Sequence, residues 1–333
     1  MPPVEIAFAE WISDAIESLG CGGAFDQTPL EAEASFRRFY RVSPHGGGSS
    51  GESYVAMYSP PEHENNTRFA RLAEVFSSRG VPVPAIRVAD PPRGFFLLTD
   101  LGSRSLADAY EEQDAEAALT TAIEYLVRIQ AVRHPTIGLY ETDRFRDELE
   151  IFREWFVAGL LRVQFPRLQL DPTFDVLIAA TQDQPQCCVH RDFHCRNLLY
   201  GTDGRFGVVD FQDALVGPVS YDLASLLRDC YHRFPEPEIT RWRNHYLATT
   251  PFELDEIRFA ELLDLSAVQR QLKAIGIFSR LHLRDAKSSH LPVILPVLDR
   301  LIDVTENYST LNPLHGWLRD IRPRADTVLK TLK

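Results

Sequence analysis

The sequence predicts an α+β fold with two lobes, a small antiparallel sheet with helix followed by a larger, mainly helical lobe. Strand-like and turn-like segments are concentrated in the first 100 residues, and the apolar spacing becomes helical from about Ser105 onward. Gly102 stands at the change between the two patterns. A chain of 333 residues, 44% hydrophobic and 25% charged, is long enough for two folded domains. We therefore expect an N-terminal lobe over residues 1–101 and a C-terminal lobe over residues 102–333.

The N-terminal lobe is expected to begin with a helix and to continue into a hairpin. Within residues 1–20 the apolar side chains fall on one helical face, namely Phe8, Trp11, Ile12, Ala15, Ile16 and Leu19. Residues 36–42 and 53–58 have the pattern of strands, and the glycine-rich residues 43–51 (SPHGGGSSG) predict the tip between them.

A second helix and two extended segments complete the predicted lobe. Residues 65–79 carry apolar side chains at helical spacing. Residues 81–88 are predicted to be extended, because Pro82 and Pro84 disfavour a helix. The apolar run of residues 94–99 (GFFLLT) is typical of a buried strand.

The C-terminal lobe is predicted to consist mainly of long helices around one short hairpin. One helix is indicated by an apolar face made of Phe145, Leu149, Phe152 and Phe156, and another extends from about residue 259 to residue 283. Residues 198–200 and 206–209 flank a glycine-containing turn at 201–204 and predict a strand-turn-strand unit.

Composition excludes several classes of function. The net charge of −12 and the lack of a basic stripe argue against a nucleic-acid partner. Apolar runs fall short of the roughly 18 residues of a membrane helix, and the acidic start does not resemble a signal peptide, so we expect a cytoplasmic protein. Five cysteines without a CxxC pair argue against a disulfide framework and a zinc site. No feature indicates an obligatory protein partner.

The most informative segment covers residues 189–213, VHRDFHCRNLLYGTDGRFGVVDFQD. Asp192 and Asn197 lie five residues apart, and Asp210 follows the predicted hairpin. Phosphoryl transfer needs a carboxylate that orients the attacking hydroxyl and takes its proton, which is the role predicted for Asp192. It also needs hard oxygen ligands for Mg²⁺, which Asn197 and Asp210 would supply. In the structural alternative, Asp192 and Asn197 cap a turn and Asp210 is a polar strand end.

These residues resemble the catalytic loop and metal-binding aspartate of the aminoglycoside phosphotransferase and choline kinase superfamily, distant relatives of the protein kinases. The resemblance continues through residues 217–229 (GPVSYDLASLLRD) and covers about residues 30–290. It implies a bilobal protein-kinase-like fold with ATP and Mg²⁺ as cofactors. It also implies that Asp222 ties its helix to the catalytic loop.

Within this superfamily the sequence is more similar to the anomeric sugar kinases of cell-wall recycling. The stretches that carry this resemblance include residues 35–42 (SFRRFYRV), 54–62 (YVAMYSPPE), 94–102 (GFFLLTDLG), 210–231 (DFQDALVGPVSYDLASLLRDCY) and 269–287 (QRQLKAIGIFSRLHLRDAK). It implies transfer of the γ-phosphate of ATP to the 1-hydroxyl of N-acetylmuramate, N-acetylglucosamine or both, in peptidoglycan recycling.

The sequence departs from the protein-kinase pattern in one respect. The strand at residues 54–58 would be expected to supply a lysine to the ATP phosphates, but no lysine precedes Lys273. Arginine can bind phosphate in a bidentate manner, and Arg37, Arg38 and Arg41 lie in the strand and turn expected to cover the nucleotide. Arg37 and Arg38 are therefore predicted to contact it. The alternative is an inactive kinase that only binds partners, and for each arginine the alternative is a solvated strand face.

The remaining predicted contacts lie near the predicted catalytic base, Asp192, and near the junction between the lobes. The resemblance implies that the backbone of Asp100, Leu101 and Gly102 binds the adenine. A sugar with an acetamido group needs an array of donors and acceptors, and the candidates are Arg191, His194, Arg196, Gln212, Asp213 and Arg228. Of these, Arg196 and Arg228 could neutralise the lactyl carboxylate of N-acetylmuramate. For each candidate the alternative is a packing role or a salt bridge.

Two other functions fit the same motifs. One is a different small-molecule kinase of the superfamily, acting on an aminoglycoside, choline or homoserine. The other is the non-catalytic nucleotide-binding protein that the missing lysine would suggest.

Overall fold

The computed structural model describes residues 3–30, 36–45, 53–112, 115–201 and 204–332. The chain divides into two compact units. The first unit contains Met1–Ala118 and Arg196–Asp213, and the second contains Leu119–Cys195 and Ala214–Lys333. The lobe bounds predicted from the sequence, 1–101 and 102–333, stay a prediction.

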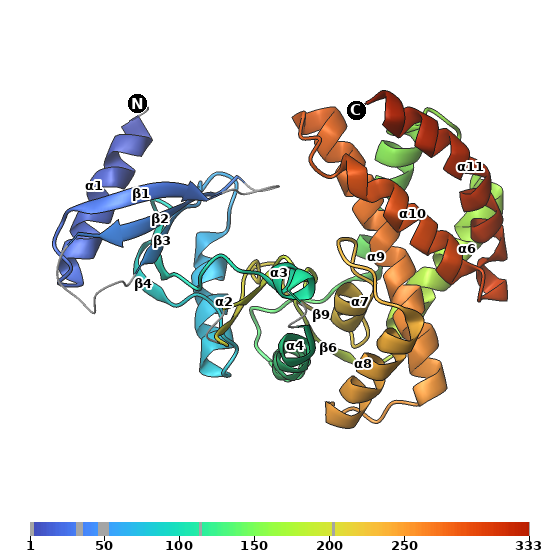
Figure 1. The fold of residues 1–333 in the computed structure, drawn as a ribbon, viewed down its shortest axis with the longest axis horizontal. Helices are drawn as coiled ribbons and strands as arrows, with labels where there is room; N and C mark the ends of the chain where they lie inside the picture. The colour runs from blue at the N-terminus through green and yellow to red at the C-terminus, as the bar shows by residue number, and fades with distance from the viewer. Residues whose placement is uncertain (1–2, 31–35, 46–52, 113–114, 202–203, 333) are drawn as a thin grey trace. The chain divides into compact units, whose positions relative to one another are not determined.

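An antiparallel sheet of five strands forms the centre of the first unit. The strands are β1 (Phe25–Leu30), β2 (Arg38–Pro44), β3 (Tyr54–Tyr58), β4 (Ile86–Asp90) and β5 (Phe95–Thr99). They lie in the order β1-β2-β3-β5-β4 (Figure 1). Every neighbouring pair is antiparallel, and the register places Met57 of β3 opposite Phe96 of β5.

Two helices cover the opposite faces of this sheet. Helix α1 (Pro3–Ser18) packs on one face, where the ring of Phe8 lies 4.9 Å from that of Phe95. Helix α2 (Asn66–Ser78) packs on the other, where the ring of Phe69 lies 5.3 Å from that of Phe96. Neighbouring residues of a strand point to opposite faces, so Phe95 and Phe96 enter different halves of the core. The aromatic run in β5 thus packs against α1 on one face of the sheet and against α2 on the other.

Several predictions for this part of the chain are confirmed. The apolar face of residues 1–20 forms α1, the predicted helix at 65–79 is α2, and the run GFFLLT contains β5. The predicted extended segment at 81–88 becomes a strand only from Ile86. The strand predicted at 36–42 is present as β2, shifted by two residues, and residues 46–51 of the predicted tip lie outside the described residues.

A short hairpin from later in the chain belongs to the same unit. Strands β7 (Leu198–Tyr200) and β8 (Phe206–Val208) pair antiparallel, as predicted from the strand-turn-strand pattern. The backbone N–H of Val208 donates to the carbonyl of Pro82 at 2.8 Å. The ring of Phe211, after β8, stacks on that of Phe69 of α2 at 5.3 Å. These contacts fix the end of the hairpin against α2.

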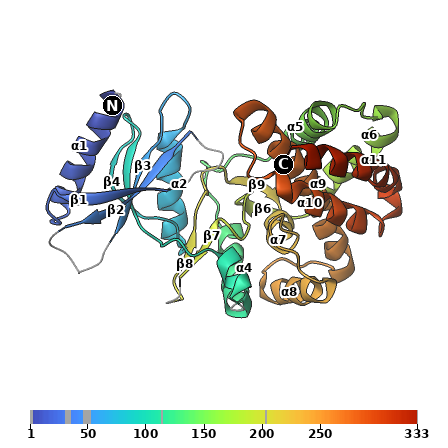
Figure 2. The same ribbon diagram turned by 45° about the horizontal axis from the view of Figure 1, so that its top comes forward.

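The second unit is mainly helical. Its long central helix, α9, covers Glu256–Asp285. It also contains α5 (Thr142–Ile151), α6 (Arg167–Gln182), α7 (Tyr221–Leu227), α8 (Glu236–Thr249), α10 (Leu291–Thr305) and α11 (Asn312–Thr331). Helix α5 continues as a π-helix over Phe152–Leu160, so the predicted helical face from Phe145 to Phe156 is present but changes its winding. Figure 2 shows α9, α10 and α11 close together in this unit.

Two further strands and two further helices belong to the described chain. Strands β6 (Gln186–Val189) and β9 (Leu215–Pro218) form an antiparallel pair in the second unit. Helix α3 (Leu106–Glu111) belongs to the first unit, and α4 (Ala115–Gln130) passes from the first unit to the second after Ala118.

Gly276 allows α9 to cross the start of the π-helix at close range. A Cβ at this position would lie 2.6 Å from the backbone nitrogen of Phe152 and 2.7 Å from its Cα. Both atoms are backbone, so neither can move aside without shifting the helix. Gly276→Ala is therefore expected to lower the free energy of unfolding by about 1–3 kcal/mol, measured by urea denaturation.

Gly316→Ala in α11 is the matched control for this prediction. A Cβ at Gly316 meets no described atom within 4 Å, and alanine favours a helix over glycine. This variant should be neutral or slightly more stable than the wild type. Equal stability of the two variants would contradict a steric role for Gly276.

Candidate active site

The loop that carries the predicted base follows β6 in the second unit. Arg191 has a φ of 80°, a left-handed conformation that a side chain disfavours. The carboxylate of Asp222, in the first turn of α7, accepts the backbone N–H of His190 at 2.6 Å and that of Arg191 at 2.9 Å. The predicted role of Asp222 as a tie between its helix and the loop is confirmed. Asp222 is fully buried, and burial raises its pKa above the ordinary value.

Asp192 follows this constrained residue and keeps 37% of its side chain exposed. Burial raises its pKa, but the charges of Lys273 and Arg270 outweigh burial and hold the pKa well below its ordinary value. The Nη2 atom of Arg270 lies 3.8 Å from Oδ1 of Asp192. Asp192 is thus a carboxylate at neutral pH and can orient a hydroxyl group and accept its proton.

A buried polar network lies next to Asp192 in the same unit. Glu148 of α5, 6% exposed, pairs with Arg191 at 2.8 Å and with Lys273 of α9 at 3.3 Å. Its Oε2 atom accepts the hydroxyl of Tyr140 at 2.6 Å and the amide of Gln269 at 3.1 Å. Burial raises the pKa of Glu148, but Lys273 and Arg191 outweigh it and lower the pKa below the ordinary value.

The predicted metal ligands lie at one end of the β7–β8 hairpin in the first unit. Asn197 immediately precedes β7, and the N–H of Val209 donates to its carbonyl at 3.0 Å. This register continues the hairpin by one residue and places Asn197 opposite Val209, the residue before Asp210, which has a φ of 65°. The amide of Gln212 donates to Oδ1 of Asp210 at 2.5 Å. Mg²⁺ is commonly held by one or two protein oxygens together with substrate phosphates, so this donor set fits it.

The segment after Asp210 is tied to helix α2. The Nε atom of Arg68 donates to the carbonyl of Gln212 at 3.2 Å, and Asp213 is exposed. Asp192 belongs to the second unit, whereas Asn197 and Asp210 belong to the first. The convergence of the three side chains on one pocket therefore stays a prediction.

The arginines predicted to cover the nucleotide are engaged within the first unit. Arg37 is buried and pairs with Glu64 at 2.8 Å, and its Nε atom donates to Ser59 at 3.1 Å. Arg38 pairs with Glu5 of α1 at 2.9 Å. Both guanidinium groups are thus engaged in ion pairs, and Arg37 does not lie on a solvated face of the strand. Contact of either arginine with nucleotide stays a prediction.

Asp100, directly after β5, accepts hydrogen bonds from three groups of the first unit. It accepts Nε of Arg41 at 2.6 Å, the hydroxyl of Ser53 at 2.7 Å and the N–H of Gly102 at 2.9 Å. Burial raises the pKa of Asp100, but these donors, Arg41 first, lower it below the ordinary value. The Gly102 N–H predicted to bind adenine thus donates to a side chain here. Leu101 packs against Gly207 of β8, where a Cβ would come within 2.6 Å of its side chain.

The predicted sugar contacts separate into two groups. Arg191 and Arg228 are largely buried in ion pairs, whereas His194, Arg196, Gln212 and Asp213 retain exposure. The ring of His194 lies 5.4 Å from that of Tyr231 in an edge-to-face arrangement. Arg196 is exposed in the first unit, next to Asn197.

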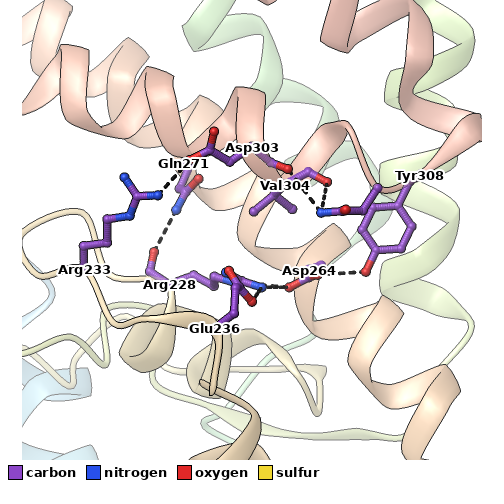
Figure 3. A network of polar contacts seen from close by, with 9 residues as sticks. Arg228, Arg233, Glu236, Asp264, Gln271, Asp303, Val304 and Tyr308 are labelled. Carbon is purple, nitrogen blue, oxygen red and sulfur yellow. Dashed lines mark hydrogen bonds and ion pairs between the residues drawn. The ribbon is translucent and has the colours of Figure 1, made fainter. Parts of the chain in front are cut away.

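Arg228 lies in the polar network of Figure 3. Its Nη2 atom pairs with Asp264 at 2.8 Å, and Nη1 pairs with Glu236 at short range. Gln271 donates to its carbonyl at 2.8 Å. The guanidinium is therefore committed to two carboxylates, which favours a structural role over contact with a lactyl group.

Three charged residues near the base were not predicted as site residues: Glu148, Arg270 and Lys273. Each is on a helix that the apolar pattern predicted, and the one signal was a charged residue within an apolar helical face. Lys273 is also the first of only four lysines in the sequence.

Comparison with known proteins identifies the family. A sequence profile described as the phosphotransferase enzyme family (APH) matches residues 26–260, more than half of the chain. The chain belongs to the phosphotransferase enzyme family. The predicted superfamily, fold class and phosphotransferase activity are thereby confirmed.

Curated members of the family are similar over most of their length. A protein of Neisseria meningitidis serogroup B named N-acetylmuramate/N-acetylglucosamine kinase is 37% identical over 310 residues, which is 89% of this chain and 91% of the relative. A protein of the same name from Pseudomonas aeruginosa is 35% identical and covers 79% of each chain.

Solved structures of other proteins share the fold at low sequence identity. A choline/ethanolamine kinase family protein from Mesorhizobium loti has a TM-score of 0.63 at 14% identity and covers 93% of this chain and 98% of its own. Choline kinase LicA from Streptococcus pneumoniae has a TM-score of 0.61 at 13% identity and covers 90% of this chain and 98% of its own. At this identity the likeness concerns the fold alone.

Proposed function

We propose that the protein transfers the γ-phosphate of ATP to the anomeric 1-hydroxyl of N-acetylmuramate, N-acetylglucosamine or both. The observation that carries this proposal is the partly exposed, anionic Asp192 on a loop that the buried network holds in place. The chain is also 37% identical to a relative named for these two sugars. The predicted place in peptidoglycan recycling and the predicted cytoplasmic location belong to this proposal. Within the described residues, no helix is long and apolar enough to cross a membrane.

Asp192 would act as the general base. Its carboxylate would accept the hydrogen bond of the sugar 1-hydroxyl and then take the proton as the hydroxyl oxygen bonds to the γ-phosphorus. The bond between the γ-phosphorus and the bridging oxygen breaks in the same step, and ADP departs with the bonding electrons. The products are the sugar 1-phosphate and ADP.

Asn197 and Asp210 would hold Mg²⁺ through an amide oxygen and a carboxylate oxygen. The bound ion would neutralise charge on the phosphates of ATP. The short contact between Gln212 and Asp210 would fix the orientation of that carboxylate.

A turnover assay with a blocked acceptor tests the function and the position of phosphorylation together. We expect ADP release with MgATP and N-acetylmuramate or N-acetylglucosamine, and phosphorus NMR should assign the product as a 1-phosphate. The methyl 1-glycoside of N-acetylglucosamine, which lacks the free anomeric hydroxyl, should be inert.

Three outcomes would contradict parts of this proposal. Phosphorylation of the methyl glycoside would exclude the 1-hydroxyl as the sole acceptor. Turnover of choline, homoserine or an aminoglycoside, without turnover of either sugar, would show that the proposed substrate is wrong. Thermal stabilisation by MgATP with no turnover across the whole panel would favour a non-catalytic nucleotide-binding protein.

A further inference from the structure

Arg270 of α9 contacts the loop of the proposed base, as Asp222 of α7 does. Its Nη2 atom donates to the carbonyl of Arg191 at 3.2 Å and lies 3.8 Å from Oδ1 of Asp192. The guanidinium lies over the ring of Tyr221 at 5.1 Å, and only 11% of the side chain is exposed. Arg270 is thus a largely buried cation at the junction between Arg191 and Asp192.

The two ends of Arg191 are held by different helices. Its N–H donates to Asp222 of α7, and its carbonyl accepts from Arg270 of α9. A left-handed φ at an arginine costs free energy and persists only where surrounding contacts impose it. The carbonyl of Arg191 is part of the peptide that leads into Asp192, so the contact with Arg270 helps to set the direction in which the Asp192 side chain leaves the backbone.

The charges around Asp192 show what Arg270 neutralises. Three cations, Arg191, Arg270 and Lys273, lie among three carboxylates, Glu148, Asp192 and Asp222. Glu148 is at ion-pair distance from both Arg191 and Lys273, and the ion pair that the structure gives Arg270 is the one with Asp192. His194 and Cys230 also interact electrostatically with Asp192.

We propose that Arg270 is a positioning residue for the general base. It fixes the carboxylate of Asp192 through the Arg191 carbonyl and keeps it anionic through its own charge. This inference rests on the proposed role of Asp192 in phosphoryl transfer. Because Arg270 acts on the base and not on the sugar, its effect should be the same for both proposed substrates.

Two substitutions separate this role from binding of the sugar. Arg270→Gln removes the charge, and we expect kcat to fall about 100-fold with both N-acetylmuramate and N-acetylglucosamine. The KM for each sugar and for ATP should stay within about threefold. Arg270→Lys keeps a cation near Asp192, and its kcat should be at least about tenfold higher than that of Arg270→Gln.

A matched control comes from the same helix. Arg284 lies near the end of α9, is 54% exposed and pairs with its neighbour Asp285. Arg284→Gln should leave kcat unchanged, so a specific effect of Arg270 is distinguished from any loss of arginine on α9. Hydrogen exchange of the amides of His190 and Arg191, followed by mass spectrometry, adds a readout that needs no substrate. Their exchange should become faster in Arg270→Gln and stay unchanged in Arg284→Gln.

The outcomes that overturn the inference differ from those that overturn the function. Full kcat in Arg270→Gln, or a lysine variant no more active than the glutamine variant, would exclude positioning by this charge. A rise in KM for N-acetylmuramate alone would make Arg270 a contact for the lactyl carboxylate instead. Unchanged amide exchange in Arg270→Gln would overturn the proposed contact with the loop. A wild type inactive toward both sugars would count against the proposed function, and amide exchange would still test the contact.

Discussion

Asp192→Asn is expected to lower kcat for the proposed sugars by about 10³-fold or more. Asparagine has nearly the same shape, but its amide cannot take the proton of the hydroxyl group, and general-base catalysis contributes about 10²–10⁴-fold. The substitution also removes the counter-charge of Arg270, 3.8 Å away. Initial rates of ADP release with N-acetylglucosamine and N-acetylmuramate measure the effect.

Nucleotide binding should survive the same substitution. The predicted Mg²⁺ ligands, Asn197 and Asp210, remain in Asp192→Asn, so MgATP should raise the melting temperature as it does in the wild type. Asp320→Asn, at an exposed position of α11, is the control and should keep full activity. A residual kcat within about tenfold of the wild type would refute the role of Asp192 as base.

The low pKa of Asp192 gives this prediction a pH signature. Its carboxylate stays ionised far below neutral pH because Lys273 and Arg270 outweigh the effect of burial. The ionised fraction of Asp192 should therefore not change between about pH 6 and pH 9, and kcat should show no acid limb from this group in that interval. An acid limb that disappears only in Asp192→Asn would contradict the lowered pKa.

Local patterns predicted the elements whose apolar spacing is set by one buried face. Helix α2 buries Phe69, Leu72 and Phe76, which are the residues whose spacing indicated it. Strand β1 escaped prediction because it is an edge strand with exposed central residues and a proline, Pro29, so it has no alternating apolar pattern. The position of β1 is set by its backbone pairing with β2. That pairing leaves no apolar pattern in the sequence of β1 itself.

The candidate site likewise contains some residues that local patterns predicted and others that only the tertiary fold brings together. Asp192, Asn197 and Asp210 could be named because they lie within 19 positions of one another and around one predicted hairpin. Arg270 comes 78 positions after Asp192, and only the packing of α9 in the second unit brings it to that loop. Arg37 had the right residue type for phosphate, but its pairing with Glu64 is a tertiary contact that the local sequence pattern does not define.

Glu148→Gln is expected to lower the free energy of unfolding by about 3–5 kcal/mol, a larger loss than that expected for Gly276→Ala. Glu148 is 6% exposed and is the shared partner of Arg191 and Lys273. A neutral amide would leave these two largely buried cations without the carboxylate that they share. Glutamine would also have to replace the hydrogen bond that Glu148 accepts from Tyr140 at 2.6 Å. Urea denaturation followed by tryptophan fluorescence measures the change.

The loss should depend on pH in a defined direction. The pKa of Glu148 is lower in the folded protein than in the unfolded chain, so its contribution to stability is present above the unfolded pKa. That contribution is lost as the pH falls through the folded pKa, and the difference between wild type and Glu148→Gln should shrink on acidification. A difference that stays constant from neutral to acidic pH would show that shape, and not charge, accounts for the loss.

A second glutamate tests whether the effect belongs to the buried network. Glu154, in the π-helix that continues α5, is exposed, and Glu154→Gln should change the free energy of unfolding by less than about 0.5 kcal/mol. If both variants lose the same stability, the cause lies in the helix and not in the pairing with Arg191 and Lys273. If only Glu148→Gln loses stability and kcat falls with it, the network that anchors the loop of Asp192 also sets its activity. Loss of stability with unchanged kcat in the folded fraction would separate the two and leave Asp222 and Arg270 as the contacts that position the base.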